Sequence, residues 1–272
     1  MNPSSRSIRP RVIWLWMSVL LIGAPLLGTG CPVRPARAAA DILLPPREEV
    51  MLGNQISQEI EEELTLHPDP NVQDYVSAVG KQIVARVEDR PEAIDFTFRV
   101  IDDLTTVNAF AIPGGWIYVY SGLMQAMDSE AELAAVLAHE IAHVTRRHLA
   151  QRLVAMYGLD VLTQVALGQD PGMLATIVAT IVGQGALLRY SRDQERDADD
   201  FGLHYAVNAG YDPRGFLEFF GKLAGRPSPP DFLLTHPSPE ARIERLESQI
   251  EELEEIPTRR EQERFEAIKA LL

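Results

Sequence analysis

Two segments in the N-terminal third of the chain place apolar residues at helical spacing among many acidic ones. Residues 47–66 carry this pattern first, and residues 72–88 repeat it. A proline-containing break at 67–70 separates them, and Asp69 or Asn71 can cap the second helix. The pattern therefore predicts two amphipathic helices joined by a short loop.

The spacing of apolar residues then changes from helical to alternating. Residues 95–102 alternate and are rich in β-forming side chains, and residues 106–120 supply two further runs on either side of a turn at 113–115. We therefore expect a small sheet of at least three strands. The last run, 116–120, comes before the next helix, and we expect it to be an edge strand, with a plain core hairpin as the alternative.

Helical spacing returns in the following part of the chain. Ser129 and Glu132 predict a capping box that opens a helix running to about Ala155. The apolar run at 172–188 has 17 residues, which is short for a membrane span. We expect a buried or lid-like helix there, with contact to a membrane surface as the alternative. Residues 226–240 hold five Pro and no regular apolar period, which predicts an ordered cover that can be displaced.

Two acidic segments with helical spacing, 238–254 and 257–271, end the chain. They make one helical pair, whereas a tetratricopeptide array needs about 34 residues per repeat and several repeats. We therefore expect no such array within these segments.

The composition indicates a folded, acidic protein. Of its 272 residues, 46% are hydrophobic and 24% are charged, which is enough apolar material for a sizeable core. The formal net charge is −14, and because residues 1–40 carry five Arg and no acid, the chain from Asp41 onward carries −19. Such an acidic body argues against nucleic acid as a partner.

The N-terminal segment is typical of an export signal. Three Arg precede an apolar run from Val12 to Leu27, and small residues follow. Three processing routes stay open: a lipid on Cys31 after the sequence LGTG, cleavage next to Ala38 or Ala40, and an uncleaved membrane anchor. We therefore expect an exported, periplasmic chain, attached to a membrane in two of these routes. Cys31 is the only cysteine, which excludes an intramolecular disulfide.

A short motif in the helix that starts near Ser129 carries metal-binding chemistry. His139 and His143 are four residues apart, with Glu140 between them. One helical turn separates the two imidazoles, so both lie on one face and can bind one metal ion. Zinc accepts neutral imidazole, and a catalytic zinc site leaves one position for water. Glu140 would take a proton from that water and pass it to the leaving amine, as in His-Glu-x-x-His metallopeptidases.

An amphipathic helix that carries His and Glu for solubility alone is the alternative interpretation. The chain has only 6 His, so this spacing around a Glu is seldom produced by composition alone. His148 follows His139 by nine residues, which places it on the opposite face of a continuous helix. We expect it on the solvated side, together with Arg146 and Arg147.

A second acidic segment supplies two carboxylates at helical spacing. Glu195 and Asp199 share one helical face, and Asp199 is placed to accept the free N–H of a metal-binding imidazole. Three further Asp in this segment make a solvated acidic helix the alternative, and charge alone favours that alternative. His204 faces away from Glu195, and His67 lies in a proline-containing loop, so we expect neither in the site.

Four segments of the chain together point to a known family. They are NAFAIPGGWIYVYSGL (108–123), AHEIAHVTRRH (138–148), SRDQERDAD (191–199) and THPSPEARIERL (235–246). They resemble the HtpX-like and CAAX-prenyl-protease-like zinc metallopeptidases, peptidase family M48, over about residues 47–250, and most resemble its small exported branch. Because the chain lacks the multiple membrane spans of other branches, we do not expect cleavage inside a membrane.

The resemblance implies a fold and a set of roles. The fold would be α+β, a mostly helical zincin-like (gluzincin) domain with a small sheet beside the zinc helix. Glu195 would complete a zinc site with His139 and His143, and Glu140 would be the catalytic carboxylate. His236 would reach the site from the far side and either stabilise the transition state or cap the metal. A loop His beside a proline is the alternative for His236.

The expected substrate-binding residues lie around the predicted edge strand. An extended peptide can pair with the free backbone groups of such a strand. The residues that we expect to bind substrate in this way are Asn108, Gly115, Trp116, Ile117 and Tyr118.

Together these observations predict a metalloendopeptidase with one Zn²⁺ per chain. The resemblance further implies that its substrates are misfolded or unassembled cell-envelope proteins and that its partner is the envelope assembly machinery. Two rival interpretations are an envelope chaperone-like or binding module with a closed, structural zinc site, and a zinc hydrolase that does not cleave peptides. We expect an export signal at 1–40, a peptidase domain at 41–255 and a C-terminal helix at 256–272.

Overall fold

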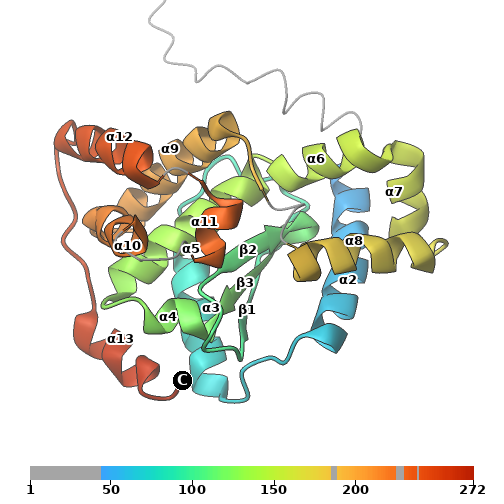
Figure 1. Cartoon of the computed structure of the whole chain (residues 1–272). Coiled ribbons are helices and arrows are strands. Elements are labelled where there is room, and N and C mark those ends of the chain that lie inside the picture. Colours follow the sequence, from blue (N-terminus) through green and yellow to red (C-terminus); the bar gives the residue numbers. More distant parts are fainter. Residues whose placement is uncertain (1–43, 185–188, 225–229, 238) are drawn as a thin grey trace, which may run out of the picture. The chain divides into compact units, whose positions relative to one another are not determined.

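The computed structural model describes residues 44–272, except 185–188, 225–229 and 238. The predicted export signal and Cys31 lie outside the described residues. Most of the described chain is helical, and one small sheet lies among the helices (Figure 1). The predicted mostly helical α+β fold is therefore confirmed.

Twelve α-helices, one short 3₁₀ helix and three strands are described in these residues. In chain order they are α2 (Pro46–Glu63), α3 (Pro70–Val84), β1 (Thr97–Ile101), β2 (Ala109–Ile112), η1 (Pro113–Gly115), β3 (Trp116–Tyr120), α4 (Ser121–Gln125), α5 (Glu130–Thr145), α6 (His148–Tyr157), α7 (Leu159–Ala166), α8 (Pro171–Gln184), α9 (Arg192–Asn208), α10 (Arg214–Ala224), α11 (Asp231–Thr235), α12 (Pro239–Glu251) and α13 (Gln262–Lys269).

The two predicted N-terminal helices are α2 and α3. Asp69 caps α3, because its side chain accepts a hydrogen bond from the amide of Asn71 at 2.8 Å. His67 lies in the loop between the helices, as predicted. The apolar residues of α2 and α3 belong to two different core clusters. The two helices therefore cover different faces of the sheet.

The sheet has the strand order β1-β3-β2. β3 pairs in parallel with β1 and antiparallel with β2. Gly114 and Gly115 in the connecting turn have φ values of 79° and 94°, which glycine adopts more readily than other residues. The central position of β3 contradicts the prediction that 116–120 is an edge strand. Both sides of its backbone are already paired, with β1 and with β2. The prediction failed because strand order depends on contacts between distant segments, which the alternation of apolar residues does not encode.

Apolar side chains are buried on both faces of the sheet. Ile117 and Val119 belong to the same core cluster as the apolar residues of α3 and α5, whereas Tyr118 and Tyr120 belong to the cluster that includes α2 and α6 to α8. This division follows from the alternation of side chains along a strand. Helix α5 therefore lies against one face of the sheet and contacts β2, with α9 and α10 on its other side (Figure 1).

Helix α5 is buried along its entire length. The hydroxyl of Ser129 accepts a hydrogen bond from the amide of Glu132, which confirms the predicted N-cap. The reciprocal half of the capping box is absent in this part of the structure, because the Glu132 carboxylate bonds to the amide of Asp128 and to Lys222.

The predicted extension of this helix to Ala155 is wrong. Helix α5 ends at Thr145, and Arg147 has a left-handed backbone with a φ of 56° before α6 begins. The buried Arg147 guanidinium donates to the Glu49 carboxylate at 2.6 Å and to the carbonyl of Leu44. We attribute the break to these contacts, because arginine favours helices and gives no local signal for a break.

Helices α6 to α8 form the part of the chain that contains the predicted apolar helix. Ile177, Val178 and Ile181 of α8 are buried against α2 and the sheet. No single helix in the described ranges is long and apolar enough to cross a membrane. Only α7 and α8 taken together reach that length and composition, across a bend of 101°.

The C-terminal segment returns to the start of α5, where α13 contacts both α3 and α5. Glu130, the first residue of α5, is fully buried. Its carboxylate accepts hydrogen bonds from the hydroxyls of Tyr75 and Tyr211 and from the guanidinium of Arg259, at 2.7 to 2.8 Å. This cluster ties the segment before α13 to the N-terminus of the central helix.

Candidate metal centre

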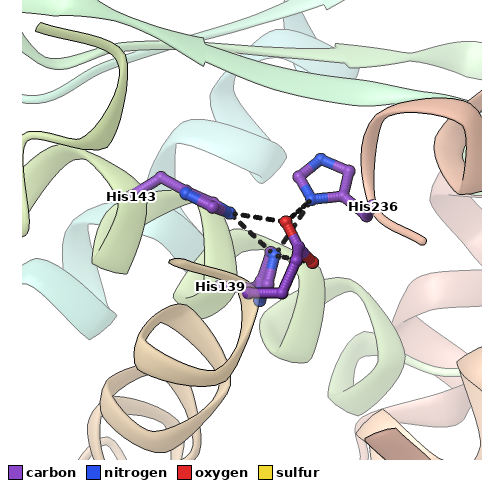
Figure 2. A group of neighbouring side chains, drawn as sticks. His139, His143 and His236 are labelled. Atoms are coloured by element: carbon purple, nitrogen blue, oxygen red, sulfur yellow. Dashed lines mark hydrogen bonds and ion pairs between the residues drawn. The ribbon is translucent and has the colours of Figure 1, made fainter. Parts of the chain in front are cut away.

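Four buried side chains converge at the middle of the fold. His139 and His143 come from α5, Glu195 from α9, and His236 from the residue after α11. One potential ligand atom from each lies within 4.8 Å of all the others. Figure 2 shows the three imidazoles turned toward one another. Residues from three distant segments are thus collected at one point.

The close approach of α9 to α5 brings Glu195 to the two histidines. A side-chain capping box formed by Ser191 and Gln194 starts α9. Two turns after Glu195, Gly202 faces α5, and a Cβ on it would lie 3.0 Å from the backbone of His139. A glycine at this crossing therefore sets a short distance between the two helices.

Several of the potential ligand atoms lie within hydrogen-bond distance of one another. Nε2 of His139 lies 3.0 Å from Nε2 of His143 and 3.2 Å from Nδ1 of His236. Nδ1 of His236 also lies 3.0 Å from Oε1 of Glu195. Imidazole nitrogen and carboxylate oxygen are ligands that zinc accepts. The converging set therefore fits a metal ion of this kind.

The electrostatics keep these groups in forms that can bind a metal. Burial, with a further contribution from Arg242, lowers the pKa of His139 to about 4, and burial lowers the pKa of His143 well below its usual value. Both imidazoles are therefore neutral near pH 7. Burial alone would raise the pKa of Glu195, but His236 and Arg242 bring it well below its usual value, so this carboxylate is ionised.

Glu140 lies beside the cluster without belonging to it. Its carboxylate is fully buried, and neither oxygen accepts a hydrogen bond from the described residues. Nε2 of His236 lies 3.4 Å from one of these oxygens. Burial raises the pKa of Glu140 to about 7, although His236 opposes that shift. A carboxyl group with this pKa can both take and give a proton near neutral pH.

Asp199 and Arg242 surround the outer side of His139. Oδ1 of Asp199 lies 3.1 Å from Nδ1 of His139, which is the contact expected from the spacing of the second acidic segment. Arg242 of α12 donates to both oxygens of Asp199 at 2.9 and 2.6 Å, and its Nη1 lies 2.7 Å from Glu195. Our sequence reasoning missed Arg242, although it stands in the THPSPEARIERL segment, because an Arg in an acidic helix usually faces solvent.

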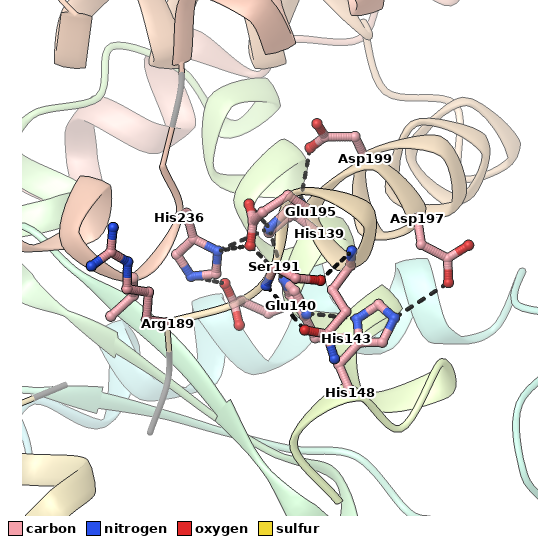
Figure 3. Close-up of polar contacts among 12 residues, drawn as sticks. His139, Glu140, His143, His148, Arg189, Ser191, Glu195, Asp197, Asp199 and His236 are labelled. Carbon is pink, nitrogen blue, oxygen red and sulfur yellow. Dashed lines mark hydrogen bonds and ion pairs between the residues drawn. The ribbon is translucent and has the colours of Figure 1, made fainter. Parts of the chain in front are cut away.

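The predicted position of His148 on a solvated face is wrong. His148 is only 4% exposed, and its Nδ1 lies 2.9 Å from Nδ1 of His143. The helical-wheel argument failed because the left-handed Arg147 interrupts the helix before His148. Arg146 and Arg147 are buried as well. Asp197, one of the Asp residues of the second acidic segment, contacts His148 (Figure 3) and accepts a hydrogen bond from Arg146.

Tyr190 is another residue that our sequence reasoning missed. Its ring stacks on His143 with a centroid distance of 3.8 Å, and it lines a small cavity together with His143 and Ala111. Its amide donates to the carbonyl of Thr235 at 3.2 Å, which connects it to α11. The SRDQERDAD segment, one of the four that carry the family resemblance, begins one residue later. Tyr190 lies outside it, and no sequence pattern marked Tyr190 as a site residue.

The free edge of the sheet nearest to the cluster belongs to β2. The amide of Tyr120 donates to the carbonyl of Asn108, so alternation along the antiparallel pair directs the backbone groups of Ala109 and Ala111 away from β3. The amide of Ala111 lies near enough to Glu140 to lower its pKa. The free edge near the cluster is therefore that of β2, one strand away from the predicted edge strand.

The predicted substrate-binding residues lie on both sides of the sheet. Trp116 and Tyr118 pack on the face that lacks α5, where they donate hydrogen bonds to Asn54 and Glu61. Ile117 packs on the α5 face, Asn108 precedes β2 and Gly115 lies in the turn. Their contact with substrate stays a prediction.

A cover, which we define as α11, His236 and Tyr190, closes this edge. The amide of Phe232 in α11 donates to the carbonyl of Val107, and the Phe232 ring stacks on His236. Ala109 and Ala111 are 0% and 3% exposed, so these residues of β2 are buried in the closed arrangement. Of the predicted cover at 226–240, the structure describes α11 and His236, and their displacement stays a prediction.

The chain is similar to several curated proteins. The chain is 36% identical to the putative beta-barrel assembly-enhancing protease of Vibrio cholerae over 210 residues, which is 72% of this chain and 43% of that protein. It is 28% identical to the beta-barrel assembly-enhancing protease of Escherichia coli K12 over 254 residues, 88% of this chain and 52% of that protein. It is 36% identical to the mitochondrial metalloendopeptidase OMA1 of Arabidopsis thaliana over 158 residues, 57% of this chain and 32% of that protein.

The chain spans about half the length, or less, of these curated relatives. The family model described as Peptidase family M48 matches residues 70–250, which include His139, Glu140, His143, Glu195 and His236. The family predicted from the four sequence segments is confirmed. Since the match extends over more than half of its residues, the chain belongs to peptidase family M48.

Proposed function

We propose that this chain is a zinc metalloendopeptidase, in which His139, His143 and Glu195 hold one zinc ion and Glu140 transfers the proton. The observation that carries the proposal is the buried Glu140 carboxylate, whose oxygens accept no hydrogen bond in the described structure, next to four converging ligand atoms. Leaving a buried carboxylate without a hydrogen bond is costly, so a site that keeps one there has a use for it.

When bound, zinc would supply Lewis-acid chemistry, which polarises a carbonyl and makes a water molecule acidic. The residues of the chain would do the rest. Asp199 would hold the His139 ring through its Nδ1, at the observed 3.1 Å. Glu140, with a pKa of about 7, would accept a proton from water and deliver it to the leaving amine.

The substrate would be an extended peptide laid along β2. Ala109 and Ala111 direct their backbone groups to this edge, and Ala111 lies beside Glu140. Backbone pairing gives affinity with little sequence preference, which suits unfolded segments of many proteins. A structure of the Glu140→Gln protein with a peptide tests this: the peptide should pair with β2, and a peptide bound elsewhere in the site would refute the arrangement.

His236 would close the resting site. It is 1% exposed and contacts His139, Glu195 and Glu140, so a peptide could not reach Glu140 without displacing it. This geometry favours capping over the alternative role, in which His236 stabilises the transition state. The two roles predict opposite effects of its removal on activity.

The relatives' names suggest where such an enzyme would act. Two of them are named beta-barrel assembly-enhancing proteases. We propose that the chain is exported, that residues 41–255 form the peptidase domain, and that misfolded or unassembled envelope proteins are its substrates. The envelope assembly machinery would then be its partner.

A chaperone-like module with a structural zinc site is the second candidate, because four buried potential ligands are what a closed site would present. Glu140 distinguishes the two candidates, since a closed structural site has no use for a further carboxylate that accepts no hydrogen bond from the described residues.

The test compares Glu140→Gln with Glu62→Gln, which changes an exposed carboxylate on α2. Zinc content should be equal in both variants and the parent. Cleavage of an unfolded protein should disappear only in Glu140→Gln. Comparable cleavage by Glu140→Gln would refute the mechanism, and a zinc-loaded parent that cleaves no peptide would favour the chaperone-like module.

A further inference from the structure

The second ring nitrogen of His143 faces a buried chain of polar groups. Nδ1 of His143 lies 2.9 Å from Nδ1 of His148, and Nε2 of His148 lies 3.3 Å from Oδ2 of Asp197. Nε of Arg146 donates to the same carboxylate oxygen at 2.7 Å. Figure 3 shows His148 between His143 and Asp197. All four side chains are less than a tenth exposed.

We propose that His148 and Asp197 are positioning residues that fix the ring orientation and tautomer of the metal ligand His143. The inference rests on the proposed metal site, in which Nε2 of His143 faces the metal. That nitrogen must then carry a lone pair, so the proton of the neutral ring lies on Nδ1.

The remaining protons can be placed in only one way. Because Nδ1 of His143 carries a proton, Nδ1 of His148 must accept it in a hydrogen bond. The proton of the neutral His148 ring then lies on Nε2, where it points at Asp197. A carboxylate can only accept hydrogen bonds, and Asp197 accepts this one together with the one from Arg146. Each hydrogen bond between Arg146 and His143 therefore joins one donor to one acceptor.

We call the hydrogen-bonded series His143, His148, Asp197 and Arg146 the relay. The break between α5 and α6 brings His148 next to His143 in this relay. In a continuous helix, five residues advance the chain by about 500°, so His148 would point well away from the Nδ1 side of His143. The left-handed Arg147 redirects the chain and returns His148 to His143. The contacts of Arg147 with Glu49 and Leu44 stabilise this backbone. A left-handed non-glycine residue costs about 1 kcal/mol or more, which these buried contacts offset.

His139 and His143, the two proposed metal ligands on α5, consequently have different hydrogen-bond partners. His139 contacts the carboxylate of Asp199 directly, whereas an imidazole stands between His143 and its carboxylate. Tyr190 stacks on the His143 ring, so the relay fixes rotation within the ring plane and the stack fixes the plane itself. Loss of the relay should leave Nδ1 of His143 without a hydrogen-bond acceptor. The other tautomer of His143, which cannot bind the metal through Nε2, should then become populated.

The test measures the affinity of the metal-free full chain for zinc, by competition with a chromophoric chelator. His148→Phe keeps a ring of similar size but removes the acceptor, and it should weaken zinc binding by about 10- to 100-fold. His148→Gln offers an amide oxygen to His143 and an amide N–H to Asp197, so it should recover part of the loss. His204→Phe is the matched control, because His204 is exposed on α9 and should change nothing.

Asp197→Asn gives a second, nearly isosteric variant if His148→Phe does not fold. The N–H of an amide in place of the carboxylate can donate to Nε2 of His148. The proton of the His148 ring then moves to its Nδ1, where it faces the proton on Nδ1 of His143. Zinc binding should weaken here too, and ¹⁵N NMR of the ring nitrogens in the metal-free protein should show a mixed His143 tautomer instead of the Nδ1–H form.

A purely structural role would lower resistance to urea and leave zinc affinity and the His143 tautomer unchanged, and that result would overturn the relay. A parent protein that binds no zinc would overturn the proposed function together with the relay. Normal zinc binding by the parent and by both His148 and Asp197 variants would overturn the relay alone.

Discussion

Replacement of Gly202 by alanine should weaken metal binding from a position that touches no ligand side chain. A Cβ at residue 202 would lie 3.0 Å from both Cα and N of His139, and 3.2 Å from the carbonyl carbon of Ala138. Ordinary contacts begin near 3.4 Å, so α9 and α5 would have to separate by a few tenths of an ångström. These neighbours are backbone atoms, so no change of rotamer relieves the contact.

The magnitude follows from two opposing effects. Alanine stabilises a helix by about 1 kcal/mol relative to glycine, and overpacking a tight contact costs about 1–3 kcal/mol. The metal-free protein can relax by separating the helices, whereas the metal-bound protein must keep Glu195 close to His139 and His143. The strain is then felt mainly by the complex, and zinc affinity should fall by about 5- to 150-fold.

Gly221→Ala is the matched control. Gly221 lies within α10, and a Cβ there would meet nothing within 4 Å. The Gly221→Ala protein should gain up to about 1 kcal/mol in the free energy of unfolding and keep the zinc affinity of the parent. Urea unfolding and chelator competition measure both quantities. The reasoning fails if Gly202→Ala gains as much stability as Gly221→Ala and binds zinc equally well.

Three further predictions concern single side chains. Glu195→Gln should strongly lower zinc occupancy, measured by metal analysis of the purified protein; stoichiometric zinc at unchanged affinity would remove Glu195 from the ligand set. His236→Ala should raise basal cleavage of an unfolded protein, whereas a loss of turnover of about 10²–10³ with zinc retained would assign it to transition-state stabilisation. Glu130→Gln should lower the free energy of unfolding by about 1–3 kcal/mol, because it weakens buried hydrogen bonds to Tyr75, Tyr211 and Arg259, and it should leave zinc affinity unchanged.

Local patterns predicted the elements that depend on local physics. The Asp69 cap, the three strands and the Ser129 cap each rest on residues within a few positions of one another. The four-residue spacing of His139 and His143 placed both on one helical face for the same reason. These features follow from backbone geometry, which sequence neighbours largely determine.

The features that the sequence did not predict depend on tertiary contacts. The break at Arg147 follows from a buried carboxylate nearly a hundred positions earlier in the chain, Glu49. The middle position of β3 depends on pairing with a distant strand, β1. Asp197 and Arg242 have charges that usually lie in solvent, and only the packing of α5, α9 and α12 shows that they are buried and paired. For the same reason, Glu195 could be chosen among its acidic neighbours only by family resemblance.

The buried β2 edge has a consequence for when such an enzyme would act. If the closed arrangement is favoured by about 3 kcal/mol, roughly one molecule in 150 is open at any moment, and the apparent affinity for a peptide falls by the same fraction. Brief encounters with folded proteins, which rarely present an extended segment, would then almost never coincide with an open molecule. A segment that stays unfolded and stays nearby would meet the open form repeatedly. With such a cover, persistence of the unfolded state, more than its sequence, would be the property that selects a substrate.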